Sequence, residues 1–304
     1  MGRVSLRLGS YFLSLCLFAG LLSAEEPKYV SGFASPESVV ADEQEKFFYV
    51  SNVGANLSPT AKDADGYISK LSPAAEVIEA KFLPPEGIEM HSPKGMAIIG
   101  KRLFVADIDR LLAFDLETKA LLYSCNFSSE HTSFLNDITV VDSTTLLLSA
   151  TDISAVFKVS LGDKAAEFKR LEVEVPGANG LFYDAKSGLA YVAGFSGKAP
   201  SKKGALASIS LSDGVYTEIA ADLGLLDGLA MSKNRSSLIF SDWGWRDEPA
   251  RISTVDLKTG KKLYRVNFLK ELNGPADFYY STKRGQLWVP LMKEGSILIT
   301  SLDF

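Results

Sequence analysis

The sequence predicts an all-β protein that folds as a six-bladed β-propeller. A unit made of a turn-prone residue, a polar residue, usually a small residue and a short apolar strand recurs six times. The polar residues stand at positions 37, 94, 136, 179, 227 and 277, so by subtraction they are 57, 42, 43, 48 and 50 positions apart. Propeller repeats have about this length.

Each copy contains enough apolar segments for one blade. From the turn-prone residue to the end of a second strand, the copies cover residues 36–50, 93–105, 135–148, 178–192, 226–240 and 276–289. Third strands follow, for example at 67–71, 111–114, 156–159 and 252–255, and fourth strands at 77–80 and 263–266. Four short antiparallel strands make a propeller blade. A two-sheet sandwich is the alternative, but it does not explain why one polar position returns in every copy.

The last repeat is one strand short, because the chain ends soon after the apolar segment at 297–299. An unassigned strand, Lys28 to Ser31, precedes the first copy. We predict that this N-terminal strand pairs as the outer strand of the last blade and closes the ring. Closure would protect sheet edges that are otherwise open.

Residues 1–24 are predicted to be a signal peptide, and residues 25–304 the propeller domain. Arg3 and Arg7 precede an apolar stretch at 11–22, which ends in the small residues Ser23 and Ala24. That stretch is short for a membrane span, although an uncleaved anchor is the alternative. We therefore expect a secreted or periplasmic protein that has no membrane contact after cleavage.

Charge argues against a nucleic-acid partner. The formal net charge is −5, and no run of Lys or Arg is long enough to form a basic binding surface. The expected partner is a small-molecule substrate, and a protein partner stays open.

The six recurring polar residues are expected to meet in the central channel, because the first strand of every blade lines it. They are Glu37, Lys94, Asn136, Asn179, Asp227 and Asp277. Carboxylate and amide oxygens of this kind suit a hard divalent cation, calcium above all, with zinc, manganese or magnesium as alternatives.

Four short motifs resemble the senescence marker protein (regucalcin) and gluconolactonase family: Glu37 after a proline, Asn136-Asp137, Asn179-Gly180-Leu181 and Asp227-Gly228. The resemblance implies a six-bladed propeller in which Glu37, Asn136, Asn179 and Asp227 hold a divalent metal and Asp227 is also the general base. It departs from the family where Glu37 lacks a following Gly-Pro, where Asn136-Asp137 lacks a following Gly, and where no tryptophan stands in that blade's second strand.

Asp277 and Lys94 complete the predicted channel set. Asp277 would assist Asp227 in catalysis or act behind it. Lys94 would bind a substrate carboxylate or an oxyanion. Alternatively, it would pair with Glu37 or Asp277 and supply the positive charge that a metal would otherwise provide.

Three further residues are predicted to bind substrate at the rim of the channel. His91 and His131 lie just ahead of the channel positions in their repeats, and Trp243 follows the second strand of the fifth repeat. The histidines would act near the channel mouth. Trp243 would form an aromatic wall, with ordinary packing between blades as the alternative.

The expected function is metal-dependent hydrolysis of a small lactone or related ester, with the metal in the channel. The alternative is a non-catalytic binding module that recognises a protein, peptide or sugar. Pro93-Lys94-Gly95 also resembles a plain turn of NHL-type propellers, which favours this alternative. The propeller fold by itself does not choose between the two.

Overall fold

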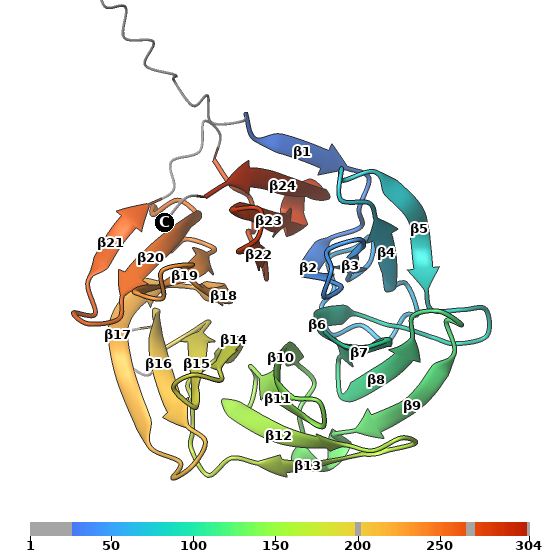
Figure 1. Ribbon diagram of the computed structural model, residues 1–304, viewed down its shortest axis with the longest axis horizontal. Helices are drawn as coiled ribbons and strands as arrows, with labels where there is room; N and C mark the ends of the chain where they lie inside the picture. Colours follow the sequence, from blue (N-terminus) through green and yellow to red (C-terminus); the bar gives the residue numbers. More distant parts are fainter. Residues whose placement is uncertain (1–25, 198–201, 266–270, 303–304) are drawn as a thin grey trace, which may run out of the picture.

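Six four-stranded antiparallel sheets surround one central axis in the computed structural model, which describes residues 26–197, 202–265 and 271–302 (Figure 1). The predicted six-bladed propeller is confirmed. The predicted signal peptide lies outside the described residues. In the described ranges, no helix has both the length and the apolar character needed to cross a membrane.

In blades one to five the innermost strand begins where the sequence repeat begins, and in blade six it begins three residues later. The innermost strands are β2 (Pro36–Ala41), β6 (Pro93–Ile99), β10 (Leu135–Asp142), β14 (Ala178–Asp184), β18 (Leu226–Met231) and β22 (Tyr279–Ser281). We number the blades one to six in this order. Blade six differs from the others, because Asp277 precedes β22 instead of lying within it.

The second strands are buried along most of their length, because each lies between two neighbouring blades. They are β3 (Phe48–Asn52), β7 (Arg102–Asp107), β11 (Thr145–Ala150), β15 (Leu189–Gly194), β19 (Ser237–Asp242) and β23 (Gln286–Leu291). Burial on both faces requires continuous apolar runs rather than alternation. This requirement explains why these strands were the strongest signal in the sequence.

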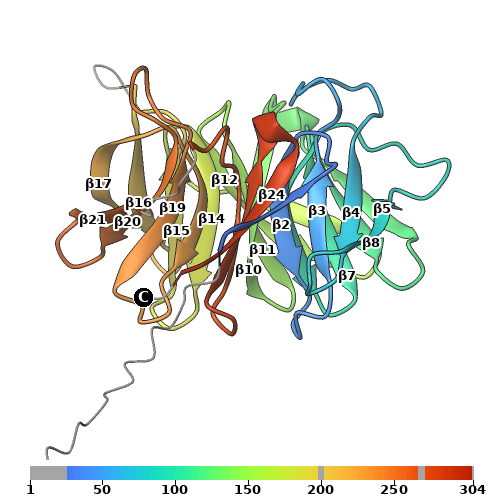
Figure 2. The same ribbon diagram turned by 90° about the horizontal axis from the view of Figure 1, so that it is seen from above.

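The third and outer strands complete each blade, and all run between the two faces of the ring (Figure 2). The third strands are β4 (Tyr67–Leu71), β8 (Arg110–Asp115), β12 (Ala155–Leu161), β16 (Gly204–Ser210), β20 (Arg251–Asp256) and β24 (Ser296–Ser301). The outer strands are β5 (Val77–Leu83), β9 (Leu121–Asn126), β13 (Ala166–Arg170), β17 (Tyr216–Gly224), β21 (Lys262–Arg265) and β1 (Lys28–Ser31). The predicted strand at 263–266 ends at Arg265 in the structure, and residue 266 lies outside the described ranges.

The core consists of separate apolar clusters between adjacent blades. Between blades one and six, for example, the Phe48 ring stacks on Trp288 with 3.9 Å between ring centroids. Phe33, just after β1, and Ile299 of β24 belong to the same cluster. Burial at each interface therefore depends on both neighbouring blades being in place.

The N-terminal strand closes the ring. β1 pairs antiparallel with β24, with Tyr29 opposite Leu298 and Ser31 opposite Ser296. In Figure 1, β1 (blue) lies along the outside of β24 (red). The predicted closure is confirmed, and blade six is built from both ends of the described chain.

Deletion of residues 25–34 should destabilise the whole ring. Blade six would lose its outer strand, and the cluster between blades one and six would lose Val30 and Phe33. Losing the burial of two large apolar side chains should lower the free energy of unfolding by roughly 3 kcal/mol or more. Urea unfolding, followed by tryptophan fluorescence, compares this variant with a chain that begins at residue 25. An unchanged midpoint would show that closure contributes no stability.

Candidate functional site

The recurring polar residue lies in a register shift of the inner strand. In blades one to five the pairing of inner and second strands is irregular from the turn-prone residue to the position three residues later. Such a β-bulge leaves residues without a partner on the next strand and changes the direction of a side chain. The repeat thus directs one polar side chain from each of these blades towards the channel.

The small residue after the polar position is required by a close approach of neighbouring inner strands. A Cβ atom built on Gly180 would lie 2.0 Å from the carbonyl oxygen of Asp227, and one on Gly228 would lie 2.8 Å from Cα of Asp277. Real Cβ atoms do not approach backbone so closely, so only glycine fits at these two positions. The inner strands therefore touch, and their polar residues come together.

A cavity of about 370 Å³ lies over these residues. Its polar lining includes five of the six recurring side chains: Glu37, Lys94, Asn136, Asn179 and Asp227. Asp277 does not line the cavity. Its carboxylate accepts a hydrogen bond of 2.5 Å from the Ser38 hydroxyl, and its backbone N–H donates to the Glu37 carbonyl at 2.9 Å. Asp277 therefore lies behind the residues that face the cavity.

Each of the four residues predicted to bind metal has one buried oxygen without a hydrogen-bond partner. These atoms are Glu37 Oε2, Asn136 Oδ1, Asn179 Oδ1 and Asp227 Oδ1, four of nine such side-chain atoms in the described residues. A buried polar atom without a partner costs roughly 1–3 kcal/mol. Four of them at one cavity point to a ligand that pairs with oxygen.

The opposite polar atoms of three of these side chains are held in place. The Asn136 amide nitrogen donates to Thr151 Oγ1 at 3.2 Å, and the Asn179 amide nitrogen donates to the Leu226 carbonyl at 3.2 Å. Asp227 Oδ2 accepts the indole N–H of Trp243 at 2.7 Å. These bonds fix each side chain so that its other oxygen is left available.

The site carries excess negative charge in a buried setting. Burial, reinforced by the Asp227 and Asp277 carboxylates, holds the pKa of Glu37 well above its usual range, although Lys94 lowers it in part. Burial raises the pKa of Asp227 to about 7, with a further contribution from Asp277. Burial likewise raises the pKa of Asp277 to about 7. A cation at the site would relieve this repulsion.

Asp137 belongs to this charged group and was not among the predicted site residues. Its carboxylate accepts the backbone N–H of Leu181 at 2.5 Å and that of Ile138 at 2.6 Å, so it joins blade three to blade four. Burial and the Asp277 carboxylate raise its pKa well above the usual range. The Asn136-Asp137 step of the motif was the available signal.

The donor set fits a hard divalent cation, because two carboxylates and two amides supply only oxygen. In residues 26–197, 202–265 and 271–302, no group of three or more His, Cys, Asp and Glu side chains is placed to hold a metal. A metal held by Glu37 and Asp227 would therefore need further oxygen ligands, which the amides of Asn136 and Asn179 can supply.

Lys94 lines the cavity but directs its ammonium to backbone carbonyls. Nζ donates to Pro59 at 2.7 Å and to Ser92 at 3.1 Å, and it lies 4.7 Å from the centroid of the Phe134 ring. Burial lowers its pKa to about 8, against the opposing effect of nearby carboxylates led by Glu37. Within the part of the chain that the structure describes, Lys94 forms no ion pair with Glu37 or Asp277.

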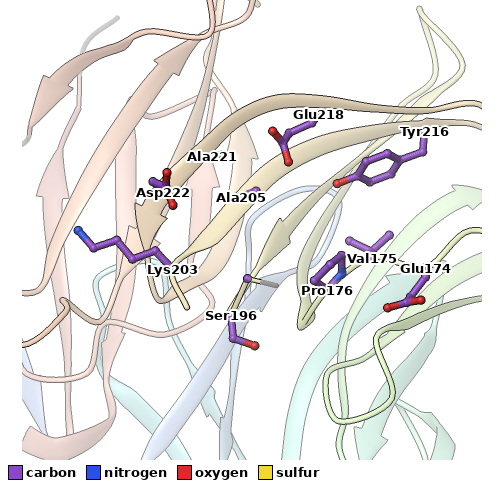
Figure 3. Close-up of a pocket in the computed structure, with 11 residues that line it drawn as sticks. Glu174, Val175, Pro176, Ser196, Lys203, Ala205, Tyr216, Glu218, Ala221 and Asp222 are labelled. Carbon is purple, nitrogen blue, oxygen red and sulfur yellow. The ribbon is translucent and has the colours of Figure 1, made fainter. Parts of the chain in front are cut away.

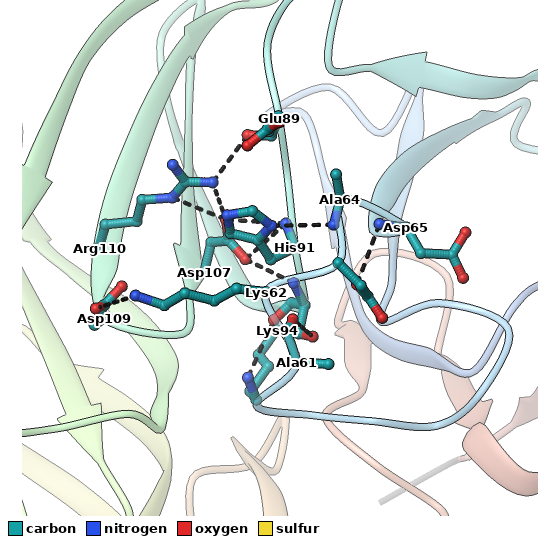
Figure 4. A network of polar contacts seen from close by, with 12 residues as sticks. Ala61, Lys62, Ala64, Asp65, Glu89, His91, Lys94, Asp107, Asp109 and Arg110 are labelled. Atoms are coloured by element: carbon teal, nitrogen blue, oxygen red, sulfur yellow. Dashed lines mark hydrogen bonds and ion pairs between the residues drawn. The ribbon is translucent and has the colours of Figure 1, made fainter.

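The contacts of Lys94 belong to a network that holds the loop between β3 and β4, residues 53–66, which we call the blade-one loop (Figure 4). His91 Nδ1 accepts the backbone N–H of Ala64 at 3.1 Å, and Lys62 of the loop pairs with Asp109 at 2.6 Å. The Ser92 hydroxyl donates to the Ser58 carbonyl at 2.9 Å. The network fixes one wall of the cavity.

Of the three predicted rim residues, only Trp243 lines the channel cavity. Trp243 lines the cavity, and its ring meets Phe195 edge to face with 6.2 Å between centroids. Neither His91 nor His131 is among the residues that line the cavity. His131 is exposed and ends the 3₁₀ helix η1 (Ser128–Glu130).

A second pocket, of about 290 Å³, lies at blade four (Figure 3). Glu174 and Pro176 face residues of β16 and β17, including Tyr216 and Glu218. None of the predicted site residues lines this pocket. The channel cavity is therefore the candidate functional site.

Comparisons with known proteins support the fold. No family model and no curated protein matches the chain. Among solved structures, Kuenenia stuttgartiensis hydrazine synthase has a TM-score of 0.63 and 11% identity, covering 90% of this chain and 79% of its own. A candidate 6-phosphogluconolactonase from Bacteroides fragilis has a TM-score of 0.61 and 16% identity, covering 89% and 81%. The Myceliophteria thermophila Cps50 (Swd1) β-propeller domain has a TM-score of 0.60 and 10% identity, covering 91% and 99%. At these identities the likeness shows the propeller fold alone.

The stability of the metal-free protein should fall as pH rises from about 5 to about 8. The folded-state pKa values of Asp227 and Asp277, about 7, exceed the ordinary value of 3.8, so the folded state holds protons that the unfolded chain releases. The resulting stability is full below the unfolded pKa and is lost as pH rises through the folded one, by up to about 1.4 kcal/mol per pH unit for each proton.

Urea unfolding in buffer with a chelator, repeated at several pH values, measures this slope. Asp277→Asn should give a shallower slope than the unmodified protein. A stability that rises over this range would contradict the assigned direction of these pKa shifts.

Proposed function

We propose that the chain is a divalent-metal-dependent hydrolase of a small lactone or related ester. The observation that carries the proposal is the set of four unpartnered oxygens, on Glu37, Asn136, Asn179 and Asp227, at one cavity. The similarity of fold to a candidate 6-phosphogluconolactonase adds support at the level of architecture. The predicted signal peptide would place the reaction outside the cytoplasm, in a secreted or periplasmic protein.

Glu37, Asn136, Asn179 and Asp227 would hold the cation, with calcium the expected ion and zinc, manganese or magnesium as alternatives. When bound, the cation polarises the substrate carbonyl and stabilises negative charge that develops on its oxygen. The bulges and the bonds to Thr151 and Leu226 keep the ligand oxygens in place before the cation arrives.

Asp227 is the proposed general base. Its Oδ1 has no hydrogen-bond partner, so this oxygen can orient the attacking water and accept its proton. The Trp243 indole N–H holds Oδ2 and thereby sets the direction of Oδ1. Asp277 would act from behind through its negative charge, which contributes to the raised pKa of Asp227.

Lys94 would mainly hold the blade-one loop in place and offset part of the negative charge of Glu37. It donates one hydrogen bond to the Pro59 carbonyl, within the blade-one loop, and one to the Ser92 carbonyl, just before β6. Because Lys94 lines the cavity, it remains the candidate partner for a negatively charged oxygen of the substrate.

A non-catalytic binding module is the second candidate. The contacts of Lys94 and His91 to the blade-one loop favour it, because they serve the structure of the channel mouth. A protein, peptide or sugar would then bind at this face without being changed. Measurements of metal binding and of turnover separate the two candidates.

Calcium should bind the protein that begins at residue 25 at one site per chain. Isothermal titration after treatment with chelator measures this binding, with manganese and zinc tested in parallel. Glu37→Gln and Asn179→Ala each remove or weaken one oxygen ligand and should lower the affinity at least tenfold. Asp213→Asn, at an exposed turn of blade four, is the matched control for a lost charge. Absence of binding by any divalent ion would rule out the metal-dependent hydrolase.

Asp227→Asn should lower turnover of a hydrolysed lactone by roughly 10²–10⁴-fold, the usual effect of removing a general base. Trp243→Phe keeps the aromatic wall but removes the hydrogen bond to Asp227, so we expect a smaller loss, about tenfold in kcat. Trp245→Phe is the control, since Trp245 does not line the channel cavity. If Asp227→Asn unfolds at much lower urea and loses activity only in proportion, Asp227 is structural.

A further inference from the structure

We call the four residues with unpartnered oxygens, Glu37, Asn136, Asn179 and Asp227, the floor of the channel cavity. The apolar side chains that line the cavity form its wall. Large apolar side chains reach the cavity from five different blades, four of them directly beside the end of a strand and one within a loop. They are Leu57 of the blade-one loop, Phe134 before β10, Phe195 after β15, Trp243 after β19 and Met292 after β23. Pro59 adds to the same wall.

Most of these side chains are only half-buried. Leu57, Phe134, Phe195 and Trp243 each retain part of their surface, whereas Met292 is buried. Apolar surface left facing a cavity of this kind is typical of a ligand site. Leu57 and Trp243 also pack against Met292 in a small cluster between blades, and the surface that they and the two phenylalanines keep at the cavity is what this packing leaves uncovered.

Two further polar residues that line the cavity, Thr151 and Asp152, already have hydrogen-bond partners. Thr151 Oγ1 donates to the Ala178 carbonyl at 2.8 Å and accepts from Asn136. The Asp152 carboxylate accepts bonds from the Thr132 hydroxyl and the Ser133 backbone N–H, both at 2.7 Å. Among the described side chains that line this cavity, the unpartnered oxygens lie only on Glu37, Asn136, Asn179 and Asp227.

We propose that the site takes an apolar lactone or ester, which presents one carbonyl group to the floor and an alkyl or aryl body to the wall. A polyhydroxylated sugar lactone would place several hydroxyl groups against apolar surface. Burying a hydroxyl without a hydrogen-bond partner is unfavourable. The apolar body gains instead from every methylene removed from water.

This substrate class rests on the proposed hydrolase function of the same site. In the reaction, the water oxygen adds to the carbonyl carbon and the bond between that carbon and the ring oxygen breaks. Asp227 accepts the water proton and passes it to the ring oxygen as that bond breaks, so Asp227 ends the reaction unprotonated. The product is a hydroxy acid whose chain is as apolar as that of the substrate.

A panel of γ-hexalactone, γ-octalactone, γ-decalactone and glucono-δ-lactone tests the inference, with calcium present. We expect kcat/KM to rise roughly tenfold for each two added methylenes until the cavity is full. Glucono-δ-lactone should be turned over more slowly than γ-decalactone. The reverse order, with the sugar lactone preferred, would overturn the apolar substrate class while leaving the hydrolase function intact.

Binding of N-octylpyrrolidone provides a readout that needs no catalysis. This lactam keeps the ring carbonyl and an apolar chain but is not readily hydrolysed, and calorimetry compares it with pyrrolidone. If no lactone is hydrolysed but the octyl compound binds at least tenfold more tightly, the hydrolase proposal fails and the apolar specificity stands. If the chain adds no affinity, the apolar specificity fails.

Leu57→Asn tests the wall directly, because it replaces an apolar side chain by a polar one of similar shape. It should reduce the advantage of γ-decalactone over γ-hexalactone at least threefold. Val215→Thr, at an exposed position outside the cavity, is the control and should leave this ratio unchanged. An unchanged ratio in Leu57→Asn, with the variant folded, would count against the wall as the binding surface.

Discussion

Neighbouring inner strands of this propeller approach one another backbone to backbone at the channel. The N–H of Asp277 reaches the carbonyl of Glu37, and the space beside Gly180 is filled by the carbonyl of Asp227. This contact leaves room only for glycine at positions 180 and 228, and the bulges direct the polar side chain itself into the channel. Glycine usage at these positions and the gathering of polar groups are therefore consequences of one steric constraint.

The same constraint creates an electrostatic problem. Buried carboxylates repel one another, and the only buried Lys that lines the cavity directs two hydrogen bonds to carbonyl oxygens. The six apolar interfaces between blades supply the stability that allows such a cluster to persist. In the proposed enzyme, a divalent cation would offset the repulsion, and the repulsion would favour binding of that cation. The polar floor would then carry out the hydrolysis, and the apolar wall would bind the body of the substrate.

The repeated parts of the molecule could be predicted from the sequence, and the irregular parts could not. The inner strands of blades one to five begin at the predicted residues because strand period and turn chemistry recur in these copies. Asp137 was missed because the position after the polar residue is small in most other copies. The blade-one loop does not follow the recurring strand pattern, so its contacts with His91 and Lys94 could not be predicted from that pattern. The apolar wall could not be predicted either, because its residues lie in loops of five different blades and share no sequence pattern.

The pairing of β1 with β24 also determines when the protein can become complete during its synthesis. β1 is made before every other strand of the described chain, and β24 after all of them. Until residue 301 has left the ribosome, blade one has no partner on its open side and the ring exposes apolar surface. Such long-range pairing slows folding and lengthens the time for which edges are open to aggregation. A ring closed in this way reaches its stable form only once β24 has been made and can pair with β1.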